Sequence, residues 1–143
     1  MLRALELARM AAKAGEVPVG AVLVSAQGKV IAEACNRVER DSDPAAHAEI
    51  LVLREAGRRL LTPRLTDHDL YVTLEPCPMC AQAVAFARIR RLYYGAEDPK
   101  GGGVDNGARV FSASSCHHRP DVYGGMYEAA SASLLREFFR QRR

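Results

Sequence analysis

The sequence has no apolar run close to the roughly 18 residues that a membrane-spanning helix needs, so we expect no membrane partner. Its first segment, MLRALELARMAAKAGE, also lacks the long apolar stretch of a secretion signal and carries early acidic residues, which favours a cytoplasmic location. No repeat, low-complexity tract or linker rich in proline and serine divides the 143 residues. We therefore predict one domain over residues 1–143, which is long enough to bury a real core.

The net charge is only +3, and the arginines near the C-terminus account for all of it. The final ten residues, LLREFFRQRR, contain four arginines and one glutamate, while the rest of the chain is formally neutral. Phe138 and Phe139 lie among these arginines, and cations interleaved with aromatic rings suit RNA with exposed bases. The alternative is a solvated helix end, where the helix dipole also favours cations.

Hydrophobic periodicity predicts that helices and strands alternate along the chain. We expect helices over residues 2–14, 44–60, 77–89 and 128–143, and strands over residues 17–24, 29–35, 69–75 and 90–96. The second helix should begin with Asp43 as its N-cap and Pro44 in the first helical position. The last helix should pack through Leu134, Leu135, Phe138 and Phe139, whereas residues 112–128 suggest loops with short helical turns. This order predicts an α/β fold with helices on both faces of a central sheet.

Cys77 and Cys80 lie three residues apart at the start of a predicted helix, so their side chains should leave the same face. Backbone N–H groups at a helix start favour thiolates, and a pair of thiolates at this spacing suits zinc. A redox pair is the alternative, although nothing else in the chain suggests a thioredoxin-like topology.

His47 is the candidate third zinc ligand, because its helix should also begin beside a strand end, where open α/β sheets bind ligands. Three protein ligands leave a position for water, as in catalytic zinc sites, whereas a fourth ligand would make the site structural. The candidates for a fourth ligand are Cys35, Cys116, His117 and His118.

Glu49 follows His47 by two residues and could accept a proton from zinc-bound water, whose pKa falls to roughly 7. The alternative for Glu49 is a carboxylate that only stabilises the helix dipole.

The segments HAE and PCPMC, with EVPVGAVLV, DPAAHAEI, LYVTLEPCPMCAQA and ARIRRLYYGAEDPKGG around them, resemble the bacterial tRNA-specific adenosine deaminases of the zinc-dependent cytidine/deoxycytidylate deaminase superfamily. The resemblance implies a three-layer α/β/α cytidine-deaminase-like fold with a mixed sheet of about five strands. It also implies one Zn²⁺ per subunit held by His47, Cys77 and Cys80, with Glu49 as the proton shuttle. The implied reaction is hydrolytic deamination of adenosine to inosine at the wobble position of a tRNA anticodon, with an arginine tRNA as the expected substrate and a homodimer as the expected assembly.

By the same resemblance, Asn36 would hydrogen-bond the target nucleoside, and Asp98 and Lys100 would lie near the bound RNA. Phe138 and Arg142 are the substrate-binding candidates in the basic C-terminal segment. Sequence alone leaves simpler roles open for Asn36, as a turn residue, and for Asp98 and Lys100, as parts of a solvated loop. Two other functions also stay open: a zinc-dependent deaminase of free guanine, cytosine or cytidine, and a non-catalytic zinc protein.

Overall fold

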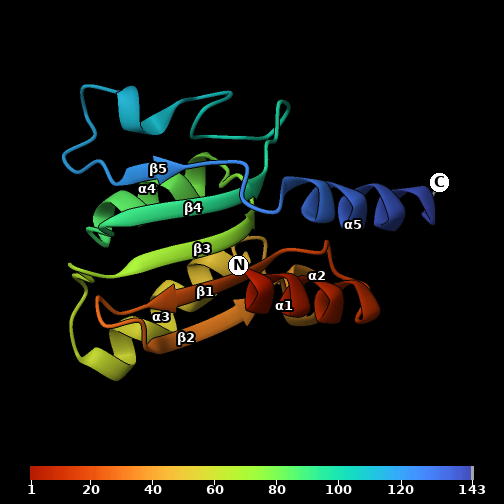
Figure 1. The fold of residues 1–143 in the computed structure, drawn as a ribbon, viewed down its shortest axis with the longest axis horizontal. Coiled ribbons are helices and arrows are strands. Elements are labelled where there is room, and N and C mark those ends of the chain that lie inside the picture. Colours follow the sequence, from red (N-terminus) through yellow and green to blue (C-terminus); the bar gives the residue numbers. More distant parts are fainter. Residues whose placement is uncertain (143) are drawn as a thin grey trace.

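A five-stranded mixed sheet with helices on both faces organises the computed structural model, which describes residues 1–142 (Figure 1). The strands are β1 (Gly20–Val24), β2 (Val30–Cys35), β3 (Asp69–Leu74), β4 (Arg91–Ala96) and β5 (Asp121–Tyr123). The helices are α1 (Leu2–Lys13), α2 (Val38–Asp41), α3 (Ala48–Leu60), α4 (Pro78–Phe86) and α5 (Glu128–Arg140), with a 3₁₀ turn η1 at Val110–Ser112. The predicted α/β class and the mixed sheet of about five strands are confirmed.

The strand order β2-β1-β3-β4-β5 sets where a site can form. β1 pairs antiparallel with both β2 and β3, whereas β3–β4 and β4–β5 are parallel pairs. The carboxyl ends of the parallel strands β3 and β4 therefore lie at the same edge of the sheet, and α4 begins at this edge, shortly after β3 ends. Such an edge is where open α/β sheets place ligands.

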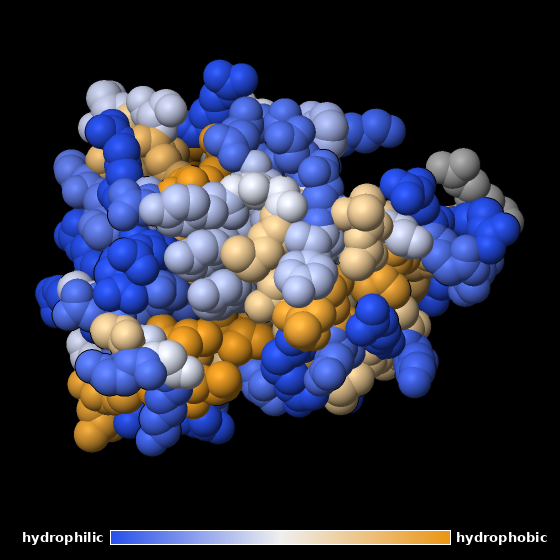
Figure 2. Space-filling view, in the orientation of Figure 1, coloured by the Kyte–Doolittle hydropathy of each residue, from blue (hydrophilic) through white to orange (hydrophobic). Residues whose placement is uncertain are grey.

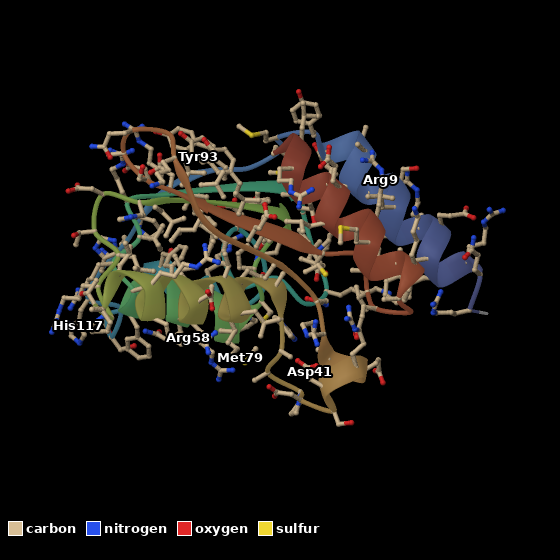
Figure 3. The ribbon with its side chains drawn as sticks, turned by 90° about the horizontal axis from the view of Figure 1, so that it is seen from below. Arg9, Asp41, Arg58, Met79, Tyr93 and His117 are labelled. Carbon is tan, nitrogen blue, oxygen red and sulfur yellow. The ribbon has the colours of Figure 1, made fainter. Side chains whose placement is uncertain are left out.

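The helices form two layers: α1 and α5 contact one face of the sheet, and α3 and α4 pack against the other. In the view of Figure 3, Arg58 and Met79 lie on the side of α3 and α4, whereas Arg9 lies on the side of α1 and α5. The main core fills the space under α3 and α4, where Val52 and Val84 pack with Leu70 and Leu92 of the sheet. Burial of each such side chain contributes roughly 1.5–3 kcal/mol to stability, so this layer stabilises the packing of α3 and α4 on the sheet.

One predicted helix start is wrong. Helix α3 begins at Ala48 with His47 as its N-cap, not at Pro44. The Asp43 carboxylate instead accepts the Ala45 N–H at 2.9 Å and stabilises a turn. Asn36, from the end of β2, accepts the Ala48 N–H at 2.9 Å, so a residue distant in sequence satisfies the helix start.

Other boundaries differ at the chain's less regular segments. α2 forms within residues 36–44, where only a loop was expected, and β5 was missed within residues 112–128. α5 ends at Arg140, and Phe139 is 47% exposed, so its placement on the packed side was wrong. The predicted helix also included residue 143, which lies outside the described residues. Across residues 1–142, no helix combines the length and apolar character that a bilayer crossing requires.

Candidate active site

Three potential metal ligands converge where α3 and α4 begin. His47 is the N-cap of α3, Cys77 is the N-cap of α4, and Cys80 lies in the first turn of α4. The His47 Nδ1 atom is 3.6 Å from Cys77 Sγ and 3.5 Å from Cys80 Sγ. A zinc ion with bonds of about 2.0–2.3 Å in a tetrahedron holds its ligand atoms about 3.5 Å apart, which matches both nitrogen–sulfur distances. All three ligand atoms lie within 4.8 Å of one another, so the group could hold a metal ion.

The two sulfurs differ in their readiness to ionise. A hydrogen bond from the Cys80 thiol, opposed by burial and assisted by His47, lowers the pKa of Cys77 to about 4. The pKa of Cys80 is raised, chiefly because its thiol donates that hydrogen bond and because it is buried. The sulfurs thus share one proton in a site that favours anions, and a divalent cation can replace that proton.

None of the four candidates for a fourth ligand joins this group. Within residues 1–142, His47, Cys77 and Cys80 form the only cluster of three or more His, Cys, Asp or Glu side chains with metal-binding spacing. The Cys116 thiol donates to the His118 carbonyl at 3.0 Å, and the His118 ring bonds the Ile89 carbonyl at 2.6 Å. The geometry therefore leaves one position of a tetrahedral ion open, as a catalytic site requires.

Glu49 lies in the first turn of α3, one residue beyond the start of the helix, and is 4% exposed. Burial raises the pKa of Glu49 to about 7. A carboxyl group with a pKa near neutrality can both accept and return a proton at physiological pH. A carboxylate that served only the helix dipole would gain nothing from such burial, so the geometry favours the catalytic interpretation.

A cavity of about 560 Å³ opens beside these residues and is large enough for a nucleoside. It brings together most of the residues that the sequence singled out: Asn36, His47, Glu49, Cys77, Asp98, Phe138 and Arg142. The Arg142 guanidinium lies over the Phe138 ring, 3.5 Å from its centroid, so a cation and an aromatic ring form one wall together.

Lys100 is the predicted substrate-binding residue that lies outside this cavity. It lines a second surface hollow with Leu135, Arg136, Phe139 and Arg140. Hydrophilic side chains cover the far end of α5 at the right of Figure 2. Contact between Lys100 and RNA stays a prediction.

The position of Asn36 is compatible with both of the roles that the sequence left open. It is 8% exposed, and its side-chain oxygen completes the start of α3, as a turn residue would. Its side chain also lines the cavity, and among the described residues no protein acceptor bonds its NH₂ group. The amide can therefore hold the helix and still donate to a ligand.

Sequence reasoning missed two buried carboxylates in the cavity wall, Glu16 and Glu75, which are 1% and 2% exposed. Glu16 accepts the backbone N–H groups of Glu39 at 3.0 Å and Arg40 at 2.9 Å, and so fixes α2 beside the cavity. The sequence contains one signal for the burial of these carboxylates. Each is a single acidic residue in an otherwise apolar segment, Glu16 in GEVPVG and Glu75 in TLEPC.

The profile of the family described as "Cytidine and deoxycytidylate deaminase zinc-binding region" matches residues 1–96, which include His47, Glu49, Cys77 and Cys80. The chain belongs to this family of zinc-binding deaminases. Within the family, it is 59% identical over 140 residues to a "tRNA-specific adenosine deaminase" of Agrobacterium fabrum, covering 98% of this chain and 91% of that protein.

The chain is similar to solved structures from both of the deaminase classes that the sequence left open, the tRNA deaminases and the deaminases of free bases. A structure from work on A-to-I editing by tRNA:A34 deaminases at the wobble position aligns with a TM-score of 0.90 and 58% identity, covering 92% of this chain and 95% of that chain. A guanine deaminase from Nitrosomonas europaea aligns with a TM-score of 0.81 and 28% identity, covering 95% of this chain and 80% of that chain. The fold is therefore shared by both classes, whereas of these two structures the one from the tRNA deaminase work is the more similar in sequence, at 58% against 28% identity.

Proposed function

We propose that this protein deaminates adenosine to inosine at the wobble position of a tRNA anticodon. The observation that carries the proposal is the His47, Cys77 and Cys80 group beside buried Glu49 in a nucleoside-sized cavity, in a chain 59% identical to a tRNA-specific adenosine deaminase. The reaction consumes one water, replaces the amino group on C6 of adenine by oxygen and releases ammonia.

In this proposal, His47, Cys77 and Cys80 hold one zinc ion per chain. A zinc ion held there would make its bound water acidic enough to act as a nucleophile at neutral pH. Glu49 takes one proton from the attacking water and delivers it to N1 of the adenine ring. It then takes the second proton from the hydroxyl that the water has become on C6 and delivers it to the amino nitrogen, which leaves as ammonia. A pKa of about 7 lets the Glu49 carboxyl perform each of these transfers in turn.

The cavity walls hold the target nucleoside in this proposal. Asn36 donates its free NH₂ group to the nucleoside, and Phe138, Arg142 and Asp98 form further parts of the cavity wall. RNA loops are recognised by such arrangements, because their bases can be splayed out and stacked on aromatic rings and guanidinium groups. Lys100 and the arginines of α5 lie outside the cavity and contact phosphates. An arginine tRNA is the substrate that we expect.

We further propose that two copies of the chain associate through α3 and α4. A groove of about 630 Å³ runs between these helices, with Leu53, Leu65 and Phe86 among its apolar lining. Phe86 is 72% exposed and Leu61 is 91% exposed, which is costly for an isolated chain. A second copy would cover these side chains. The proposed location is the cytoplasm, where tRNA is available.

The test is incubation of zinc-loaded protein with total tRNA, followed by mapping of inosine by sequencing and mass spectrometry. We expect inosine at the wobble position of an arginine tRNA and none at other adenosines. Free guanine, cytosine and cytidine serve as competing substrates in parallel reactions. Turnover of a free base as fast as that of an anticodon stem-loop would replace this proposal by the small-molecule alternative.

A further inference from the structure

The carboxylate of Glu75 receives five N–H donors from one loop, more than any other side chain that the structure describes. Its Oε1 atom accepts the Asp98 N–H at 3.1 Å and the Asn106 side-chain NH₂ at 2.7 Å. Its Oε2 atom accepts the backbone N–H groups of Val104, Asp105 and Asn106 at 3.2, 3.1 and 3.0 Å. The loop from residue 98 to residue 106 is thus folded around a single buried anion.

This loop forms one wall of the substrate cavity, through Asp98 and Gly101, and carries Lys100 on its outer side. It includes three consecutive glycines at residues 101–103, and glycine-rich segments lose more conformational entropy on ordering than other segments do. A Cβ atom on Gly102 would clash with Oε2 of Glu75, so glycine is what permits the backbone to approach the carboxylate. Without an internal anchor such a loop would sample many conformations.

We propose that Glu75 is a positioning residue, whose carboxylate holds the 98–106 loop in the conformation that completes the cavity and thereby sets the affinity for RNA. The effect on RNA rests on the proposed function, whereas the effect on the loop does not. Glu75 precedes Cys77 by two residues, yet its five donors all belong to the loop and none belongs to His47, Cys77 or Cys80.

The Glu75→Gln variant isolates this role because glutamine has the same shape. Whichever way its amide turns, an NH₂ group must face either the two donors on the Oε1 side or the three on the Oε2 side, and those donors lose their acceptor. The matched control is Glu97→Gln, which removes the same charge from an exposed residue at the start of the same loop.

The first measurement is amide hydrogen exchange of the zinc-loaded proteins. In Glu75→Gln, we expect exchange in residues 98–106 to rise by about ten-fold or more, because the loop opens more often. Exchange in α3 and a zinc content of one ion per chain should stay unchanged, and Glu97→Gln should match the wild type. Unchanged loop exchange would overturn the proposal, as would loss of zinc together with faster exchange in α3, since Glu75 would then support the metal site.

The second measurement is steady-state kinetics on an anticodon stem-loop. We expect KM to rise by about ten-fold in Glu75→Gln with kcat within about three-fold, because the loop conformation that binds RNA is populated less often. Adding Asn106→Asp to Glu75→Gln reverses the donor and the acceptor of the side-chain hydrogen bond between residues 75 and 106. The double variant should therefore have a KM between those of Glu75→Gln and the wild type. A fall in kcat at unchanged KM would contradict a positioning role. Failure of the wild type to edit the stem-loop would refute the proposed function alone, because hydrogen exchange tests Glu75 without substrate.

Discussion

Replacing Asn36 tests whether one amide both starts helix α3 and binds the substrate. In Asn36→Ala the Ala48 N–H loses its acceptor at a position that is 0% exposed. Loss of a helix cap and of a buried hydrogen-bond acceptor costs about 2 kcal/mol of unfolding free energy. For a chain of this size, that cost corresponds to a fall in Tm of about 6 °C.

The Asn36→Asp variant separates the two roles. Its carboxylate still accepts the Ala48 N–H, and a negative charge at a helix N-terminus is favourable, so stability should stay within about 1 kcal/mol of the wild type. The NH₂ group that lines the cavity is lost, however, and kcat/KM on an anticodon stem-loop should fall by about 10–100-fold.

The assay combines thermal unfolding of the zinc-loaded proteins with single-turnover inosine formation, and zinc content is measured for each variant. We expect Asn36→Ala to be both less stable and less active than the wild type, whereas Asn36→Asp should keep its stability and lose activity by about 10–100-fold. An Asn36→Asp enzyme with wild-type activity would show that the amide does not donate to the nucleoside. An Asn36→Ala protein with an unchanged Tm would show that the bond to Ala48 does not hold the helix.

Five further substitutions probe the proton shuttle, the metal site, the association surface and the RNA surface. Glu49→Gln should retain zinc by metal analysis and lose about 10³-fold in kcat, because it cannot carry protons; a fully active variant would remove Glu49 from the mechanism. His47→Ala should bind less than one zinc per chain and unfold at a lower temperature, since metal binding adds to folding free energy; full zinc occupancy would exclude His47 as a ligand. Phe86→Glu should shift the molar mass measured by light scattering from two chains to one; a wild type that is already monomeric would refute the association surface. Lys100→Ala and Arg136→Ala should each lower the slope of log Kd against log salt for RNA by about 0.7; unchanged slopes would mean that neither side chain contacts a phosphate.

Local rules explain why much of the site was predictable. Cys77 and Cys80 are three residues apart at a helix start, and proline at the first helical position of α4 marks that start in the sequence. His47 and Glu49 are two residues apart at a second helix start, so each pair is positioned by its own short segment. Once the fold brings the starts of α3 and α4 together at one edge of the sheet, His47, Cys77 and Cys80 lie close enough to share a metal ion.

The parts that were missed depend on contacts between distant segments. The Asp43–Pro44 pair satisfies the local rule for a helix start, but Asn36, twelve residues before Ala48, supplies the acceptor for the Ala48 N–H. Helix α3 therefore begins four residues later than predicted. β5 has three residues and pairs only with β4, so it has no periodicity of its own to detect. Glu75 is an ordinary glutamate in the sequence, and only the folded loop gives it five donors.

Two buried glutamates in one cavity wall illustrate how environment assigns chemistry. Burial raises the pKa of both Glu49 and Glu75 when it acts alone. At Glu75 the Asn106 side chain and the N–H groups of the loop outweigh burial and hold its pKa below the usual range, so the carboxylate is charged at neutral pH and can serve as an anchor. At Glu49 burial dominates, and the pKa of about 7 suits a group that must gain and lose protons. The same residue type therefore stays charged where hydrogen-bond donors converge on it, and its pKa rises toward neutrality where burial dominates.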